Sequence, residues 1–147
     1  MSGRERRNAT ETRFLNVDLD LVAKADLTPL LETFGDSVVV LRNTVERRVH
    51  TLWLEHSPEP RHVDHAFMQY AKLVRRLPRT QRKLWNDCRS RCLNIGIQSA
   101  AEPHAQCFDL SEEAVLAAGE LGASIVITVY GSGAKGRPSR SLKRNAG

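Results

Sequence analysis

The fold is decided by one stretch of the sequence, Phe14-Leu15-Asn16-Val17-Asp18-Leu19-Asp20-Leu21. Leucine and valine alternate there with asparagine and aspartate, and a period of two residues is typical of a β-strand with one buried face. Comparable apolar runs predict further strands over residues 38–41, 49–54, 92–98 and 124–130. The segment 104–108 is a candidate for a sixth strand.

Helices are predicted between these strands. Apolar residues recur at helical spacing over 67–77, and Pro78 ends or kinks that helix. A second helix is expected directly after it. We expect the helix boundaries at Thr28 (N-cap) and Gly35 (stop), at Thr80 (N-cap), and at Ser111 (N-cap) and Gly122 (stop).

Two segments near the two ends of residues 14–130 have similar sequences. Leu15-Asn16-Val17 parallels Leu93-Asn94-Ile95, and Asp26-Leu27-Thr28 parallels Asp109-Leu110-Ser111. Either the chain holds two duplicated βαβ units or two ordinary units share their cap chemistry. The expected fold is α+β, with a mixed five- or six-stranded sheet, helices on one face and a ferredoxin-like arrangement. The open sheet face would then carry Asn16, Asp18, Asp20, Asn94, Gln98 and Tyr130, as a ligand site or simply as the wet side of the sheet.

Charge divides the chain into a body and two tails. The 147 residues carry 22 Lys and Arg against 17 Asp and Glu, a net charge of +5. Residues 1–13 hold four of these cations and two acids, and residues 131–147 hold five cations and no acid. We therefore predict a disordered N-terminal tail (1–13), a single α+β domain (14–130) and a disordered basic C-terminal tail (131–147).

The body itself has a net charge of −2, because 13 cations and 15 acids lie between residues 14 and 130. Its positive charge is concentrated in one helical segment. A row of cations at helical spacing fits a phosphate backbone or an acidic protein surface, and also fits a solvated helix face. The candidate partner-binding residues are Lys72, Arg75, Arg76, Arg79, Arg82 and Lys83.

Motifs for catalysis or cofactor binding are weak. Asp18 and Asp20 share a strand face, but without a nucleophile or a third acid we interpret them as solvated acids. His62 and His65 have the spacing of two metal ligands, but no second paired motif accompanies them, and Asp64 as a helix cap is the alternative that we favour. We therefore predict no catalytic residue, no metal and no cofactor.

Cysteine usage and the N-terminus bear on location. Cys88, Cys92 and Cys107 are odd in number and form no CxxC motif, which favours buried thiols in a reducing compartment. The N-terminus lacks the apolar stretch of a signal peptide, and no apolar run has the length of a membrane span. We expect a cytoplasmic protein.

The order of elements resembles a bacterial family of small domains of unknown function, the domain of unknown function 4279 type. The resemblance is carried by Leu93-Asn94-Ile95, by Asp109-Leu110-Ser111 and by the closing run Leu121-Gly122-Ala123-Ser124-Ile125-Val126-Ile127-Thr128-Val129-Tyr130. Members more often have an acid where this chain has Thr128. The resemblance implies a fold and no catalytic residue.

Three functions fit these observations. The first is a non-enzymatic interaction module, with an immunity or adaptor role, that binds an acidic protein through the basic helical segment. The second is sequence-nonspecific nucleic-acid binding through the tails and the same segment. The third is a small-molecule or enzymatic site on the open sheet face. A homodimer is compatible with each, and a membrane partner is not expected.

Overall fold

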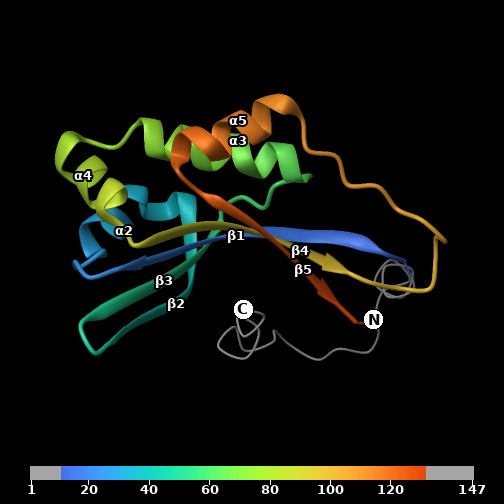
Figure 1. The fold of residues 1–147 in the computed structure, drawn as a ribbon, viewed down its shortest axis with the longest axis horizontal. Helices are drawn as coiled ribbons and strands as arrows, with labels where there is room; N and C mark the ends of the chain where they lie inside the picture. Colours follow the sequence, from blue (N-terminus) through green and yellow to red (C-terminus); the bar gives the residue numbers. More distant parts are fainter. Residues whose placement is uncertain (1–10, 132–147) are drawn as a thin grey trace.

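The computed structural model describes residues 11–131, which form an α+β fold of one mixed five-stranded sheet and four α-helices. All four helices lie on one side of the sheet (Figure 1). The elements follow in the order β1 (Arg13–Ala23), α2 (Thr28–Phe34), the short 3-10 helix η1 (Gly35–Ser37), β2 (Val38–Glu46), β3 (Val49–His56), α3 (Val63–Arg75), α4 (Arg79–Asp87), β4 (Ser90–Gln98), α5 (Glu112–Leu121) and β5 (Ser124–Tyr130).

The strands lie in the order β2-β3-β1-β4-β5. Strand β1 is central and pairs antiparallel with both β3 and β4, while β4 and β5 are parallel neighbours. The connection from β4 through α5 to β5 is thus a βαβ unit between adjacent strands. In the corresponding unit from β1 through α2 to β2, β3 lies between the two parallel strands. The two similar segments therefore have different surroundings in the sheet.

The hydrophobic core lies between the sheet and the helices. The predicted alternation holds from Asn16 to Leu21, where Val17, Leu19 and Leu21 are fully buried on the helix side. A β-bulge between Phe14 and Asn16 interrupts it, so that Phe14 rather than Leu15 packs against the core. Helix α3 contributes Phe67 and Tyr70, which are also fully buried. Burying each large apolar side chain contributes about 1.5–3 kcal/mol, so this layer supplies most of the favourable free energy of folding.

Two sequence predictions about the strands differ from the structure. Residues 104–108 form no strand, so the prediction of a sixth strand is wrong. That segment alternates poorly and lies in a long connection between β4 and α5. Strand β1 also begins one residue before the predicted domain boundary at residue 14. Thr12 bonds to the backbone of Ala100 and Glu102, and β1 begins at Arg13. The rest of the N-terminal tail and nearly all of the C-terminal tail lie outside the described residues.

Helix caps were predicted correctly at α5 and nearly so at α2. The Ser111 hydroxyl accepts from the backbone N–H of Ala114, and Gly122 ends α5 in the left-handed region. Helix α2 begins at Thr28 rather than after it, because the Asp26 carboxylate binds both the backbone N–H and the hydroxyl of Thr28. Helix α4 likewise begins one residue before Thr80, with Pro78 at the cap position.

A tight hairpin joins β2 to β3. Its turn residues, Arg47 and Arg48, both have positive φ angles, of 49° and 63°. Two successive residues in this region are typical of a type I′ turn, which prefers Asn and Gly. The turn therefore has the geometry of a strong hairpin but not its usual residues. Within residues 11–131 no helix is both long and apolar enough to cross a bilayer.

Candidate functional site

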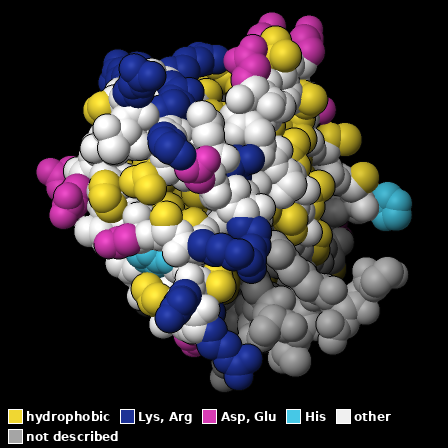
Figure 2. All heavy atoms as spheres, turned by 60° about the vertical axis from the view of Figure 1, so that its left-hand side comes forward, with side chains coloured by type: hydrophobic (Ala, Val, Ile, Leu, Met, Phe, Trp, Pro, Cys, Tyr) yellow, Lys and Arg dark blue, Asp and Glu magenta, His cyan; other side chains and the backbone are white. Residues whose placement is uncertain are grey.

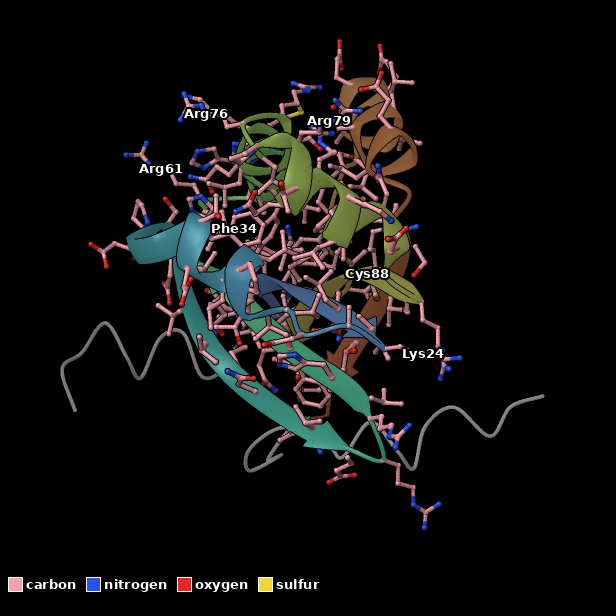
Figure 3. All side chains as sticks on the ribbon, turned by 90° about the vertical axis from the view of Figure 1, so that its left-hand side faces the viewer. Lys24, Phe34, Arg61, Arg76, Arg79 and Cys88 are labelled. Atoms are coloured by element: carbon pink, nitrogen blue, oxygen red, sulfur yellow. The ribbon has the colours of Figure 1, made fainter. Side chains whose placement is uncertain are left out.

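The basic helical segment forms a corner where α3 ends and α4 begins. We call its six cations the α3–α4 corner: Lys72, Arg75, Arg76, Arg79, Arg82 and Lys83. They do not form one stripe along one helix, because α3 ends at Arg75 and Pro78 starts the new direction of α4. Figure 2 shows Lys and Arg side chains gathered at the upper edge of this face, and Figure 3 places Arg76 and Arg79 at the same end of the molecule.

Two of the six cations are held by acids. Arg75 contacts Glu120 of α5 at 3.5 Å, and Lys83 contacts Asp87 one helical turn later at 2.7 Å. The hydrogen bond that Lys83 donates to the Asp87 carboxylate raises the pKa of Lys83. All four side chains are well exposed to solvent, so these pairs contribute little to stability. Within the described part of the chain, Lys72, Arg76, Arg79 and Arg82 form no ion pair.

A shallow depression of about 500 Å³ lies on α4. Arg79, Arg82 and Lys83 bring three positive charges to its wall, and Asp87 brings one negative charge. Thr80 and Asn86 complete the lining with neutral hydrogen-bonding groups. Guanidinium groups bind carboxylate and phosphate oxygens through parallel N–H donors. The depression therefore has the chemistry of a site for an anionic group.

Arg91 lies close in sequence to these cations, but its side chain has a structural role. Its guanidinium donates to the backbone oxygens of Trp85, Cys88 and Gly122, at 2.9–3.1 Å. Trp85 is itself fully buried, and its indole N–H donates to the oxygen of Leu121. Arg91 thus joins the C-terminal ends of α4 and α5 beneath the corner and holds α4 in place.

The open sheet face carries the predicted polar residues. Strand register places Asp18 opposite Asn94, Asp20 opposite Cys92, and Gln98 opposite Tyr130. The interpretation of Asp18 and Asp20 as solvated acids is wrong, because these residues are only 8% and 4% exposed. They lie on the central strand of the sheet with paired strands on both sides, a position that a single strand pattern does not reveal.

The neighbouring strand β3 adds Trp53, which the sequence offered as one alternative for this face, and Glu55, which it did not indicate. Glu55 of β3 lies opposite Asp18, and Trp53 lies opposite Asp20. The guanidinium of Arg42, on β2, stacks over the Trp53 ring at 4.9 Å from its centre. The alternation within β3 indicated which of its residues share a face, but only the pairing with β1 shows that Glu55 joins the two aspartates.

Amides of the open face take part in local bonds. The Thr128 hydroxyl donates to Asn94 Oδ1 at 2.9 Å, joining β5 to β4. Gln98 donates to the backbone oxygens of Tyr130 and Gly131. Asn16 Oδ1 accepts from the backbone N–H of Val17 at 2.8 Å, whereas its Nδ2 has no hydrogen-bond partner among residues 11–131. This donor belongs to a residue that is only 8% exposed.

Histidines and cysteines have structural positions. His62 is the N-cap of α3 and accepts from the backbone N–H of His65, so the cap is His62 and not Asp64. Asp64 instead accepts from the backbone N–H of Ser111 and links the starts of α3 and α5. Across the described ranges, no three His, Cys, Asp or Glu side chains are grouped to hold a metal ion.

The three thiols are free, and two of them are buried. Cys88 lies at the end of α4 and donates to the oxygen of Leu84, and its burial raises the pKa of its thiol to about 11. Cys92 lies on the open sheet face, and Cys107 is exposed, contrary to the expectation of burial. A thiol with a raised pKa is a poor nucleophile at neutral pH.

Comparisons with protein-family models, with curated proteins and with solved structures gave no match to this chain.

Proposed function

We propose that the protein is a non-enzymatic interaction module that binds an acidic segment of another protein through the α3–α4 corner. The observation that carries this proposal is the set of four exposed or half-exposed cations that have no acidic partner within residues 11–131. Two of them, Arg79 and Arg82, line the depression on α4. A carboxylate placed there meets two guanidinium groups and the Thr80 hydroxyl.

A protein partner is favoured over nucleic acid by the surroundings of the corner. Proteins that bind single strands combine cations with exposed aromatic rings. The lining of the depression has no aromatic residue, and Trp85 of α4 is fully buried. The corner suits a short anionic segment.

Charge reversal tests this proposal in the full-length chain. An Asp- and Glu-rich peptide and a DNA duplex of equal charge are titrated by fluorescence anisotropy at two salt concentrations. We expect the peptide to bind, and the double variant Arg79→Glu/Arg82→Glu to weaken it by about tenfold or more. Lys24→Glu is the matched control, because Lys24 is exposed and lies away from Arg76 and Arg79 (Figure 3).

Two outcomes contradict the proposal. Equal loss of binding in Lys24→Glu and in the double variant would mean that net charge, and not the corner, attracts the peptide. Tighter binding of the duplex than of the peptide, with a steep loss of affinity as salt rises, would assign the corner to nucleic acid.

We also propose that the fold is a variant of the ferredoxin-like arrangement. The described elements run β1-α2-β2-β3-α3-α4-β4-α5-β5, and we regard them as a ferredoxin-like order to which α4, α5 and β5 are added. The five-strand order departs from a four-stranded ferredoxin-like sheet by β5. Free cysteines support a reducing, cytoplasmic location. Kinship with the bacterial family of unknown function, and duplication of the βαβ units, remain predictions from the sequence.

A further inference from the structure

We propose that the free edge of β5 is a dimer interface, at which a second copy of this chain adds its own β5 in antiparallel orientation. The sheets of the two copies then form one continuous sheet, with the two β5 strands at its centre. The α3–α4 corner takes no part in this surface. The proposal therefore does not depend on the function suggested for that corner.

The two edge strands of the sheet, β2 and β5, are protected to different degrees. Charged residues and bulges are the usual means by which an exposed strand edge avoids pairing with another chain. Strand β2 has both, because it carries Arg42 and Glu46 and its register shifts between Val40 and Arg42. Strand β5 has neither, because its register against β4 is continuous and residues 121–131 contain no charged residue. The edge of β5 is therefore open to a further strand.

The backbone bonds of β5 indicate which of its residues face the free edge. The N–H of Ser99, directly after β4, donates to the oxygen of Tyr130 at 2.9 Å, so the Tyr130 backbone points toward β4. Backbone groups of successive residues in a strand point to alternate sides. Those of Ile125, Ile127 and Val129 consequently point away from β4, and in the described part of the chain they have no hydrogen-bond partner. A further strand would bond to these three residues.

The side chains of the same three residues form an apolar row on the helix side of the sheet. Parallel register partners share a face, and Ile95, the partner of Ile127, is buried in the core. The row itself is poorly covered, since Ile125, Ile127 and Val129 are 38%, 59% and 55% exposed. The core surface thus continues onto β5 beyond the cover of the helices, which all lie on this side (Figure 1). An exposed apolar row of this kind marks an interaction surface.

Helix α5 adds apolar surface beside this row. Glu120 of α5 contacts Arg75 of α3, and Tyr70 binds α3 to β1, so this side of α5 faces the middle of the sheet. Val115 lies five residues before Glu120, which places it about 140° around the helix, on the side of the β5 edge. The Val115 side chain is 49% exposed. A second strand at this edge would therefore bring its chain against α5 as well.

A second copy fits this edge in a symmetric register. Ile127 is the middle residue of β5, and a two-fold axis at Ile127 pairs every residue of the strand. Ile127 then lies opposite its own copy, and Ile125 lies opposite Val129. All three residues have outward backbone groups, so each of these pairs exchanges both of its hydrogen bonds. The apolar rows of the two copies adjoin, and β5 brings no charged residue into the contact.

This edge favours a second copy over a strand of a different protein. A strand without charged residues gives a different partner no charge to recognise. The self-complementary register instead recognises a copy through the spacing of its apolar residues and backbone groups. Two-fold homodimers are also the commonest assemblies of soluble proteins.

The test measures self-association of the full-length chain by sedimentation equilibrium across the micromolar concentration range. We expect a monomer–dimer equilibrium that Ile127→Lys weakens by about tenfold or more, because this variant places two like charges directly opposite each other. Val45→Lys is the matched control, since Val45 is 66% exposed on the other edge strand, β2. This variant should leave the dissociation constant within about twofold of the natural value.

A mixture of two variants tests the register. Ile127→Glu should weaken dimerisation as Ile127→Lys does, because each variant repels its own copy. Mixing the two should restore dimerisation, since the mixed dimer has opposite charges facing each other at the two-fold axis. A mixture that associates no better than either variant alone would contradict the proposed pairing.

A measurement on the unaltered chain guards against variants that fold poorly. Nuclear magnetic resonance follows hydrogen exchange of the backbone N–H groups of Ile125, Ile127 and Val129 at low and high protein concentration. These groups should exchange about tenfold or more slowly when the dimer is present. The proposal would be overturned by a chain that stays monomeric throughout the micromolar range, or by a dimer in which these three N–H groups exchange as fast as in the monomer. Equal weakening by Val45→Lys and Ile127→Lys would overturn it as well.

Discussion

Replacing Tyr70 with phenylalanine tests how α3 is anchored to the sheet. The fully buried Tyr70 hydroxyl donates to the backbone oxygen of Val17 on β1 at 2.8 Å, and the oxygen of Leu54 on β3 lies 3.4 Å away. Phenylalanine keeps the packing of the ring and removes only the donor. The buried Val17 oxygen then lacks this bond, so we expect a loss of about 1–3 kcal/mol of unfolding free energy at pH 7.

The effect of this substitution should depend on pH. Burial, followed by the charge of Asp18, raises the pKa of Tyr70 above its ordinary value of 10.0. The unfolded chain therefore loses the phenolic proton first, so the contribution of the Tyr70 hydroxyl to stability is complete below pH 10 and falls above it. The slope is about 1.4 kcal/mol per pH unit, which the phenylalanine variant lacks. The gap of about 1–3 kcal/mol should thus close within roughly one to two pH units above pH 10.

Urea denaturation followed by circular dichroism, in steps from pH 7 to pH 11.5, measures this gap. A Tyr130→Phe variant controls for the loss of a phenol at a half-buried position on β5. A gap that stays constant from pH 7 to pH 11.5 would refute the reasoning, because the hydroxyl would then not be held in a site that opposes its ionisation. No loss at pH 7 would refute the anchoring role.

Two further predictions concern the hairpin turn and Cys88. Replacing Arg47 with Asn and Arg48 with Gly should stabilise the protein by about 1 kcal/mol, because positive φ angles are costly for residues with larger side chains; an unchanged urea midpoint would contradict this. Burial raises the Cys88 pKa from 9.0 to about 11, so stability that is complete below pH 9 falls between pH 9 and 11 as the unfolded thiol ionises first. A Cys88→Ala variant should lose less stability over that interval in the same urea assay, and parallel decline of both proteins would exclude the explanation.

Local patterns in the sequence were sufficient for most of the fold. Three features could be predicted because they depend only on residues close in sequence. They are the alternation in β1, the Ser111 cap of α5 and the end of α5 at Gly122. The segment 104–108 was mistaken for a strand because a short run of mixed residues carries no period. The cap of α3 was assigned to Asp64 because aspartate is the more common cap, whereas the structure uses His62.

The candidate sites could be predicted only in part, because they depend on contacts between distant segments. Helical spacing indicated the cations of α3, but Pro78 turns Arg79 onto a second helix, and the pairing of Arg75 with Glu120 spans 45 residues. Asp18 and Asp20 are buried on the central strand of the sheet, a position that no local pattern contains. Glu55 joins them only through the register of β3.

The central position of β1 has a consequence for synthesis on the ribosome. Among residues 11–131, β1 is synthesised before the other strands, but its partners are β3 (Val49–His56) and β4 (Ser90–Gln98), which emerge much later. An alternating apolar strand must therefore wait, half-exposed, until residues up to Gln98 have left the exit tunnel. Its three polar residues, Asn16, Asp18 and Asp20, keep this waiting strand from pairing with other nascent chains. The carboxylates of Asp18 and Asp20 thus limit strand pairing between nascent chains before they become part of the folded sheet.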